Sequence, residues 1–135
     1  MALPIHPHLA ILRTVATLEL SALLGQAGWA AAFLGGQREY VVHHEVGALV
    51  TLVVCLAGAG VYVVLRRSAG PVNVVLSLLL AALVVAQYAL GEAAAVSAHI
   101  FLGVLLVMTG TALTSWTYRH TLPGASGRPL PGTPL

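Results

Sequence analysis

The sequence predicts an all-α integral membrane protein, a four-helix up-and-down bundle built from two similar helical hairpins. Hydrophobic residues make up 59% of the chain and charged residues only 7%, with no Lys and no Asp. So little charge cannot cover the surface of a soluble domain. Four apolar runs of roughly 18 residues or more could each cross a bilayer as a helix. The likeness between the two halves of the chain predicts the paired hairpins.

The predicted spans are joined by short connections and followed by a tail. They cover residues 14–35, 42–65, 72–91 and 96–118, within a transmembrane domain of residues 1–120. Each run is apolar on every face and lacks the alternation of a transmembrane strand, which indicates helices. Residues 121–135 are rich in Pro and Gly, which predicts a cytoplasmic tail without regular structure.

The distribution of arginine predicts the orientation. Only Arg38 falls on one side of the membrane if the chain crosses four times. The other five share the opposite side: Arg13, Arg66, Arg67, Arg119 and Arg128. The positive-inside rule then puts both termini in the cytoplasm and the chain in the inner (cytoplasmic) membrane. Basic residues interleaved with exposed aromatics are absent from the sequence, so a nucleic-acid partner is not expected.

The two hairpins share a short pattern of polar and small residues. The first contains LLGQAG and then HHEVGALVTLV, and the second contains QYALGEAA and then HIFLGVLLVM. Their alignment pairs Gln26 with Gln87, His43 with His99, and Gly47 with Gly103. A repeat of this kind places a binding site at the interface between the two copies.

His43 and His99 are the predicted ligands of a haem b. Short loops make successive helices antiparallel, so the second and fourth spans lie diagonally across the core and run in the same direction. The two histidines then lie at the same depth near the outer face and face each other, which is the protein contribution to a bis-histidine haem. A closed zinc site is a poorer match, because it needs four ligands. Cys55 lies about 18 Å from His43 along the same helix and is too far away to be one of them.

Several further residues have predicted supporting roles around this haem. Arg38, Tyr40 and His44 are the available donors to the propionates, and Gln26 and Gln87 could hydrogen-bond a ligand imidazole or close the cavity. Gly47 and Gly103 leave room for close helix packing or for a macrocycle. His44 is rotated by about 100° around the helix axis from His43 and is therefore expected to face the loop or a neighbouring helix. It is the alternative ligand.

Glu19 is a carboxylic acid inside the first span, where a charge is costly. Two interpretations are open for it. The functional one is a proton path or a quinone contact. The structural one is a hydrogen bond to Thr114 or Ser115 of a neighbouring helix, or to a partner subunit.

The segment AQYALGEAAAVSAHIFLGVLLV resembles the corresponding hairpin of the haem A synthase family, and the resemblance extends over about residues 15 to 118 at the level of architecture. It implies a four-helix haem-binding bundle with histidines near the outer ends of the second and fourth helices, as His43 and His99 are. The family's catalytic glutamate stands three residues before the second-helix histidine, where this sequence has Tyr40, or Val41 if His44 is the ligand. Glu39 is one residue away from fitting. The chain also resembles short four-helix bacterial membrane proteins of unassigned function.

The leading hypothesis is a membrane haem b protein that acts in electron transfer or as an accessory subunit of a respiratory or redox complex. Its partners would be the lipid bilayer and a quinol, an external cytochrome or another subunit. A second hypothesis is an accessory or assembly subunit without a cofactor. A third is a half-size haem-modifying enzyme that uses Glu39, although the sequence favours a non-enzymatic role.

Overall fold

The structure is a computed structural model that describes residues 6–122. The helices are α1 (Pro7–Leu34), α2 (Tyr40–Val64), the single-turn α3 (Arg66–Ala69), α4 (Pro71–Glu92) and α5 (Val96–Arg119). No strand occurs within residues 6–122, and the four long helices are each long and apolar enough to cross a membrane. The all-helical prediction is therefore confirmed, and each predicted span overlaps one of these four helices. The predicted tail lies, from residue 123 onward, outside the described residues.

α1 begins well before the residue at which the first span was predicted to start. Pro7 occupies its first turn, and the ring Nδ1 of His6 accepts a hydrogen bond from the backbone N–H of His8 at 3.2 Å. Arg13 is thereby inside the helix, where its guanidinium donates to the Tyr118 carbonyl at 3.1 Å and lies 5.3 Å above the Tyr118 ring. Both of these contacts are supplied by α5, so they tie the start of α1 to the end of α5.

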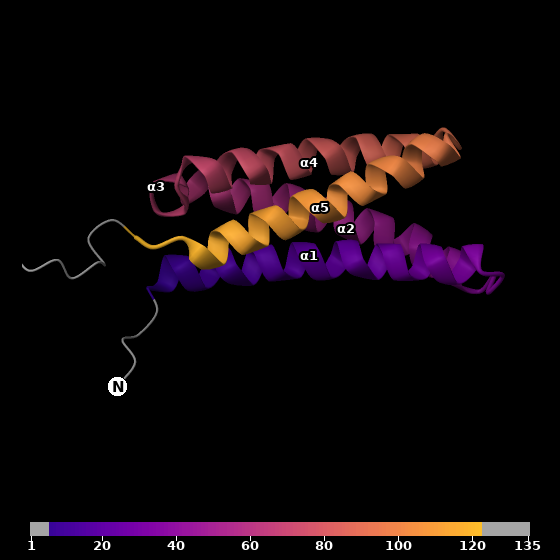
Figure 1. Ribbon diagram of the computed structural model, residues 1–135, viewed down its shortest axis with the longest axis horizontal. Helices are drawn as coiled ribbons and strands as arrows, with labels where there is room; N and C mark the ends of the chain where they lie inside the picture. The colour runs from indigo at the N-terminus through magenta and orange to yellow at the C-terminus, as the bar shows by residue number, and fades with distance from the viewer. Residues whose placement is uncertain (1–5, 123–135) are drawn as a thin grey trace, which may run out of the picture.

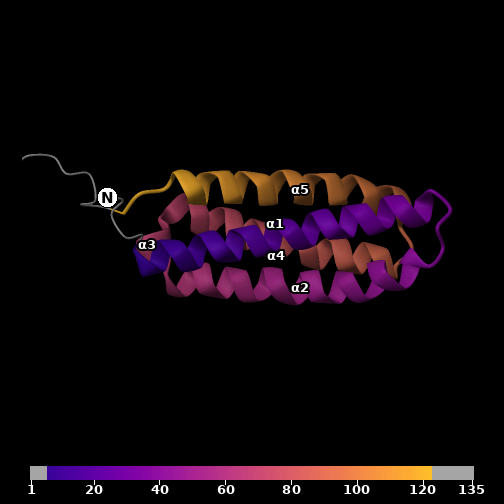
Figure 2. The same cartoon turned by 90° about the horizontal axis from the view of Figure 1, so that it is seen from below.

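The four long helices form a ring in which each one packs against two others. α1 contacts α2 and α5, and α4 contacts α2 and α5, which leaves α2 and α5 on opposite sides of the core (Figures 1 and 2). The connections at residues 35–39 and 93–95 lie at one end, here called the hairpin end. Both ends of the described chain and α3 lie at the other, here called the terminal end.

A buried network of polar side chains ties the helices together near the terminal end. The Tyr62 hydroxyl lies 3.2 Å from the Leu12 carbonyl and 2.8 Å from the Thr117 hydroxyl, and Thr117 donates to Asn73 at 3.2 Å. Asn73 in turn donates to the Ala69 carbonyl at 2.8 Å. Because these residues come from α1, α2, α3, α4 and α5, the network fixes the spacing of the helices at this end.

The turn between α2 and α4 is also held to both ends of the described chain. Ser68 lies 2.8 Å from the Nδ1 of His8, and its carbonyl accepts a hydrogen bond from the Nε2–H of His120 at 3.0 Å. Gly70 has a φ of +78°, and a Cβ there would come within 2.9 Å of the His120 ring. Glycine is therefore required at this turn both for its backbone conformation and for its lack of a side chain.

The two hairpins, α1–α2 and α4–α5, diverge toward the hairpin end. At the terminal end α5 finishes beside the start of α1, whereas at the hairpin end the α4–α5 connection stands apart from the α1–α2 connection (Figure 1). α1 and α5 approach closely at Gly110, where a Cβ would lie 2.7 Å from the Leu23 side chain. The space between the hairpins at the hairpin end is where the candidate site lies.

Candidate functional site

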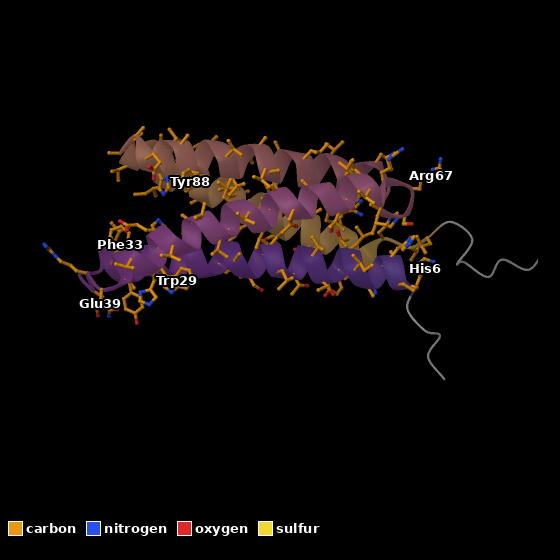
Figure 3. The ribbon with its side chains drawn as sticks, turned by 180° about the vertical axis from the view of Figure 1, so that it is seen from behind. His6, Trp29, Phe33, Glu39, Arg67 and Tyr88 are labelled. Atoms are coloured by element: carbon orange, nitrogen blue, oxygen red, sulfur yellow. The ribbon has the colours of Figure 1, made fainter. Side chains whose placement is uncertain are left out.

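Two adjoining cavities occupy the space between the hairpins, and we call them together the cleft. The α1/α5 lobe has a volume of about 490 Å³ and the α2/α4 lobe about 470 Å³. Both lobes are lined by His44 of α2, Tyr88 of α4 and His99 of α5. Figure 3 shows Phe33 and Tyr88 at this end of the molecule, on the two hairpins. The cleft is within the size range of cofactor-binding cavities.

His99 is held in one orientation by its neighbours on α4. Its Nδ1–H donates to the backbone carbonyl of Gln87 at 3.0 Å. Gly91 leaves room for the ring, because a Cβ at that position would lie 3.2 Å from the His99 Cε1. Since the carbonyl can only accept, the proton of a neutral His99 is on Nδ1 and the Nε2 keeps its lone pair. This is how ligand histidines are prepared for metal binding.

His44 lies across the cleft from His99. The centres of their rings are 6.1 Å apart and the ring planes are nearly perpendicular, at 82°. Phe33 packs against His44 with ring centres 5.7 Å apart. The His44 ring is close to the backbone of Gln26, but its buried Nδ1 has no hydrogen-bond partner among the described residues. The cleft therefore brings together one imidazole from each hairpin.

The prediction that His43 faces His99 is wrong. The His43 side chain is exposed, and its Nδ1–H donates to the Glu39 carbonyl at 3.2 Å. Its ring lies 6.2 Å from that of Trp29 and 5.5 Å from that of Tyr40. Figure 3 shows Trp29 on the side of the α1–α2 hairpin away from Tyr88. His44, expected at the rim, takes the place that was predicted for His43.

Gln26 and Gln87 occupy equivalent places in the two hairpins. Both line the α1/α5 lobe. A Cβ at Gly47 would collide with the Gln26 amide, and a Cβ at Gly103 would lie 3.2 Å from the Gln87 amide nitrogen. The predicted hydrogen bond between a glutamine side chain and a ligand imidazole is not formed, because the backbone of Gln87 makes that contact with His99. The Nε2 of Gln26 and the Oε1 of Gln87 are buried without a hydrogen-bond partner among the described residues.

The charged residues near the cleft differ from those predicted. Arg38 is exposed in the connection between α1 and α2 and is not among the residues that line either lobe. Glu45 and Glu92, one from each hairpin, line the α2/α4 lobe instead. That lobe therefore bears negative charge at its rim, and the predicted contact of Arg38 with the site is not observed.

Glu19 lies outside the cleft, deeper in the bundle. Its side chain is only 1% exposed, and neither carboxylate oxygen has a hydrogen-bond partner among the described residues. The predicted bond to Thr114 is not formed: Thr114 donates to the Ala16 and Gly110 carbonyls, whereas the Glu19 carboxyl lies against Gly58 of α2, where a Cβ would collide with it. Glu19 faces α2 rather than α5, so Ser115 of α5 is also not its partner.

Two residues of the cleft, Phe33 and Tyr88, were not predicted from the sequence. Tyr88 directly follows Gln87, and Phe33 lies two turns beyond Gln26 on the same helix. A search of each predicted helix for aromatic residues next to the repeated glutamines or within two turns of them would have found both. Such residues are common as interfacial anchors in membrane helices, so the pattern alone carries little weight.

Comparison with known proteins gives no relative for this chain. No protein-family model, no curated protein and no solved structure matches it.

Proposed function

We propose that this chain is a membrane haem b protein in which His44 and His99 bind the iron. The observation that carries the proposal is the pair of facing imidazoles, one from each hairpin, inside a mainly apolar cleft. Buried polar atoms without partners are rare in folded proteins and indicate an unrecorded ligand or a functional role. Three of them belong to residues that line the cleft, Gln26, His44 and Gln87.

The spacing of the rings agrees with two imidazoles bound to one metal. Two metal–nitrogen bonds of about 2 Å each, plus the distance from each nitrogen to its ring centre, give about 6 Å between ring centres. The observed distance is 6.1 Å. His99 would coordinate through its Nε2, because its Nδ1–H is used by the Gln87 carbonyl.

The small number of protein donors favours a haem over a bare metal ion. Within residues 6–122 no group of three or more His, Cys, Asp or Glu side chains is close enough to share a metal. A structural zinc site needs four ligands and a catalytic one needs three. A porphyrin supplies four nitrogen ligands itself and needs only the two axial imidazoles.

The surroundings of the cleft modify the sequence-based hypotheses. Neither lobe has an arginine among its lining residues, so water at the hairpin end would solvate the haem propionates in place of Arg38. Glu39 is exposed at the start of α2 and does not line the cleft. Its position gives no support to a half-size haem-modifying enzyme, and we favour electron transfer or an accessory role in a larger redox complex.

The orientation of the bundle would place this haem near the outer face of the inner membrane. Of the arginines within residues 6–122, Arg13, Arg66, Arg67 and Arg119 lie toward the terminal end, and only Arg38 lies at the hairpin end. The positive-inside rule assigns the terminal end to the cytoplasm. One haem at the hairpin end cannot carry electrons across the whole bilayer, so the protein needs a redox partner there.

The visible spectrum of the protein purified from haem-replete cells tests this proposal. We expect a Soret band and a sharp α-band on reduction. Both should be lost in His44→Ala and in His99→Ala, because each removes one axial ligand. His43→Ala is the matched control and should retain the spectrum, since that ring is exposed on the other side of the hairpin.

Two results would count against the proposal. A colourless protein with normal helicity and a sharp thermal transition would favour an accessory subunit without a cofactor. Loss of the spectrum in His43→Ala but not in His44→Ala would show that the ligand assignment is wrong.

A further inference from the structure

The two facing histidines are held differently by the helices behind them. His99 donates its Nδ1–H to the Gln87 carbonyl at 3.0 Å. His44 is close to the backbone of Gln26, the residue equivalent to Gln87 in the repeat. Its buried Nδ1 nevertheless has no hydrogen-bond partner among the described residues. The repeat therefore places the same groups beside both rings but completes the hydrogen bond for only one of them.

A single difference between the hairpins coincides with this asymmetry. The residue four positions after the repeated glutamine is Ala30 on α1 and Gly91 on α4. Both line the α2/α4 lobe together with His44 and His99. A Cβ at Gly91 would lie 3.2 Å from the Cε1 and 3.3 Å from the Nδ1 of His99, so the ring would have to shift. Ala30 carries such a Cβ at the equivalent place in the first hairpin.

The hydrogen bond at Nδ1 affects how an imidazole binds a metal. A carbonyl that accepts from Nδ1–H fixes the orientation of the ring and raises the basicity of the other nitrogen. His99 has this support and His44 lacks it. His44 should therefore be the weaker ligand of the two and the first to detach from a shared metal.

We propose that Gly91 makes His99 the permanent ligand of the haem and that Ala30 makes His44 the replaceable one, so that a neutral diatomic gas such as carbon monoxide binds the ferrous iron on the His44 side. The inference rests on the proposed haem. In the exchange one imidazole–iron bond breaks and one carbon–iron bond forms, with no transfer of electrons or protons. Ala30 and Gly91 are positioning residues, because they act on the iron only through the two rings.

The rate at which carbon monoxide binds tests this inference. The full chain, purified with its haem, is reduced and mixed with carbon monoxide, and the Soret band is followed with time. We expect a rate constant that levels off at high gas concentration, because detachment of His44 limits it. Ala30→Gly should lower this limiting rate about two- to tenfold, because the His44 ring can then reach the Gln26 carbonyl. Gly91→Ala should raise it about twofold or more, because neither ring is then held.

The expected directions separate this positioning role from a general effect on stability. Glycine weakens a helix relative to alanine. A looser helix would make Ala30→Gly bind the gas faster and a firmer one would make Gly91→Ala bind it more slowly, which is the opposite of what we expect. Ala32→Gly is the matched control, since Ala32 is on the same helix and lines neither lobe. It should bind carbon monoxide at the parent rate.

Two results would overturn the inference and leave the haem in place. One is a limiting rate that is the same in Ala30→Gly and Ala32→Gly. The other is a reduced protein that has its Soret band but binds no carbon monoxide. A protein without a Soret band would instead overturn the proposed function, and this inference with it.

Discussion

Gly47 and Gly103 are equivalent in the repeat, but the space beside them differs. A Cβ at Gly47 would collide with both the Gln26 amide and the Trp29 ring. At Gly103 the nearest atom is a single flexible amide nitrogen, 3.2 Å away. The α1–α2 hairpin therefore depends on its glycine more strongly than the α4–α5 hairpin does.

Alanine substitutions should rank in that order. We expect Gly47→Ala to lower the free energy of unfolding by about 1–3 kcal/mol, as other overpacked sites do, and Gly103→Ala to have a smaller effect. Gly60→Ala is the control, because nothing lies within 4 Å of its added Cβ. Thermal unfolding in detergent, followed by circular dichroism, measures all three. An equal loss at Gly47 and Gly60 would contradict the close packing.

Glu19 is expected to reduce stability in the isolated protein. Its buried oxygens have no partner among the described residues, and an unsatisfied polar group loses its hydration without compensation. Glu19→Leu should therefore raise the midpoint of thermal unfolding, and Glu19→Gln should change it little. If Glu19→Leu instead lowers the midpoint, the carboxyl has a partner that the isolated chain does not show.

The choice between His43 and His44 was available in the sequence, but only from the whole buried face of the helix. The buried residues of α2 are Gly47, Thr51, Cys55, Gly58, Ala59 and Tyr62. At about 100° per residue, His44 lies about 10° from their mean direction and His43 about 90° from it. The prediction favoured His43 because it rested on one position, the glycine four residues further on that His99 also has, instead of on all six.

At the scale of elements, the polar network at the terminal end and the cleft at the hairpin end divide the bundle into two halves. Tyr62, Asn73 and Thr117 are each at most 1% exposed. Their hydrogen bonds hold the helices at a fixed distance where no lobe of the cleft reaches. The positions of these polar residues were visible in the sequence, but their pairing was not, because it depends on how four helices turn toward one another.

Removal of the Tyr62 hydroxyl should loosen this end of the bundle. Tyr62→Phe deletes the contacts to Leu12 and Thr117, and interhelical hydrogen bonds in membrane proteins contribute about 0.6–2 kcal/mol each. Tyr118→Phe is the matched control, since that hydroxyl pairs with Thr17 at an exposed position. Unfolding in a denaturing detergent should show a larger loss for Tyr62→Phe. Equal losses would mean that the network adds nothing to stability.

The helices themselves were largely predictable, and their divergence was not. Apolar length predicted the four spans, and α1 extends beyond the first of them to Pro7. The splay of the hairpins arises from the sum of many contacts, such as the close approach at Gly110. The combined effect of many such contacts cannot be predicted from a single sequence. The cleft and its two lobes were therefore found only in the structure.

At the scale of the whole molecule, the arginines predict the orientation in the membrane. Cysteine labelling can test this, because the single native cysteine, Cys55, is buried and can be replaced by alanine. In spheroplasts, a charged maleimide should label Gln37→Cys at the hairpin end without permeabilisation. Thr121→Cys, beyond α5, should react only after the membrane is opened. The opposite pattern would invert the bundle and place the cleft near the cytoplasm.

The hydrophobic core cluster includes residues beyond the cleft, such as Leu12, Tyr62, Ala69 and Leu113. These residues and the hydrogen-bonded network line neither lobe of the cleft. If the cleft binds haem as we propose, we therefore expect loading to be a late step in biogenesis. The amount of folded protein in cells starved of haem should then stay nearly constant while its occupancy falls.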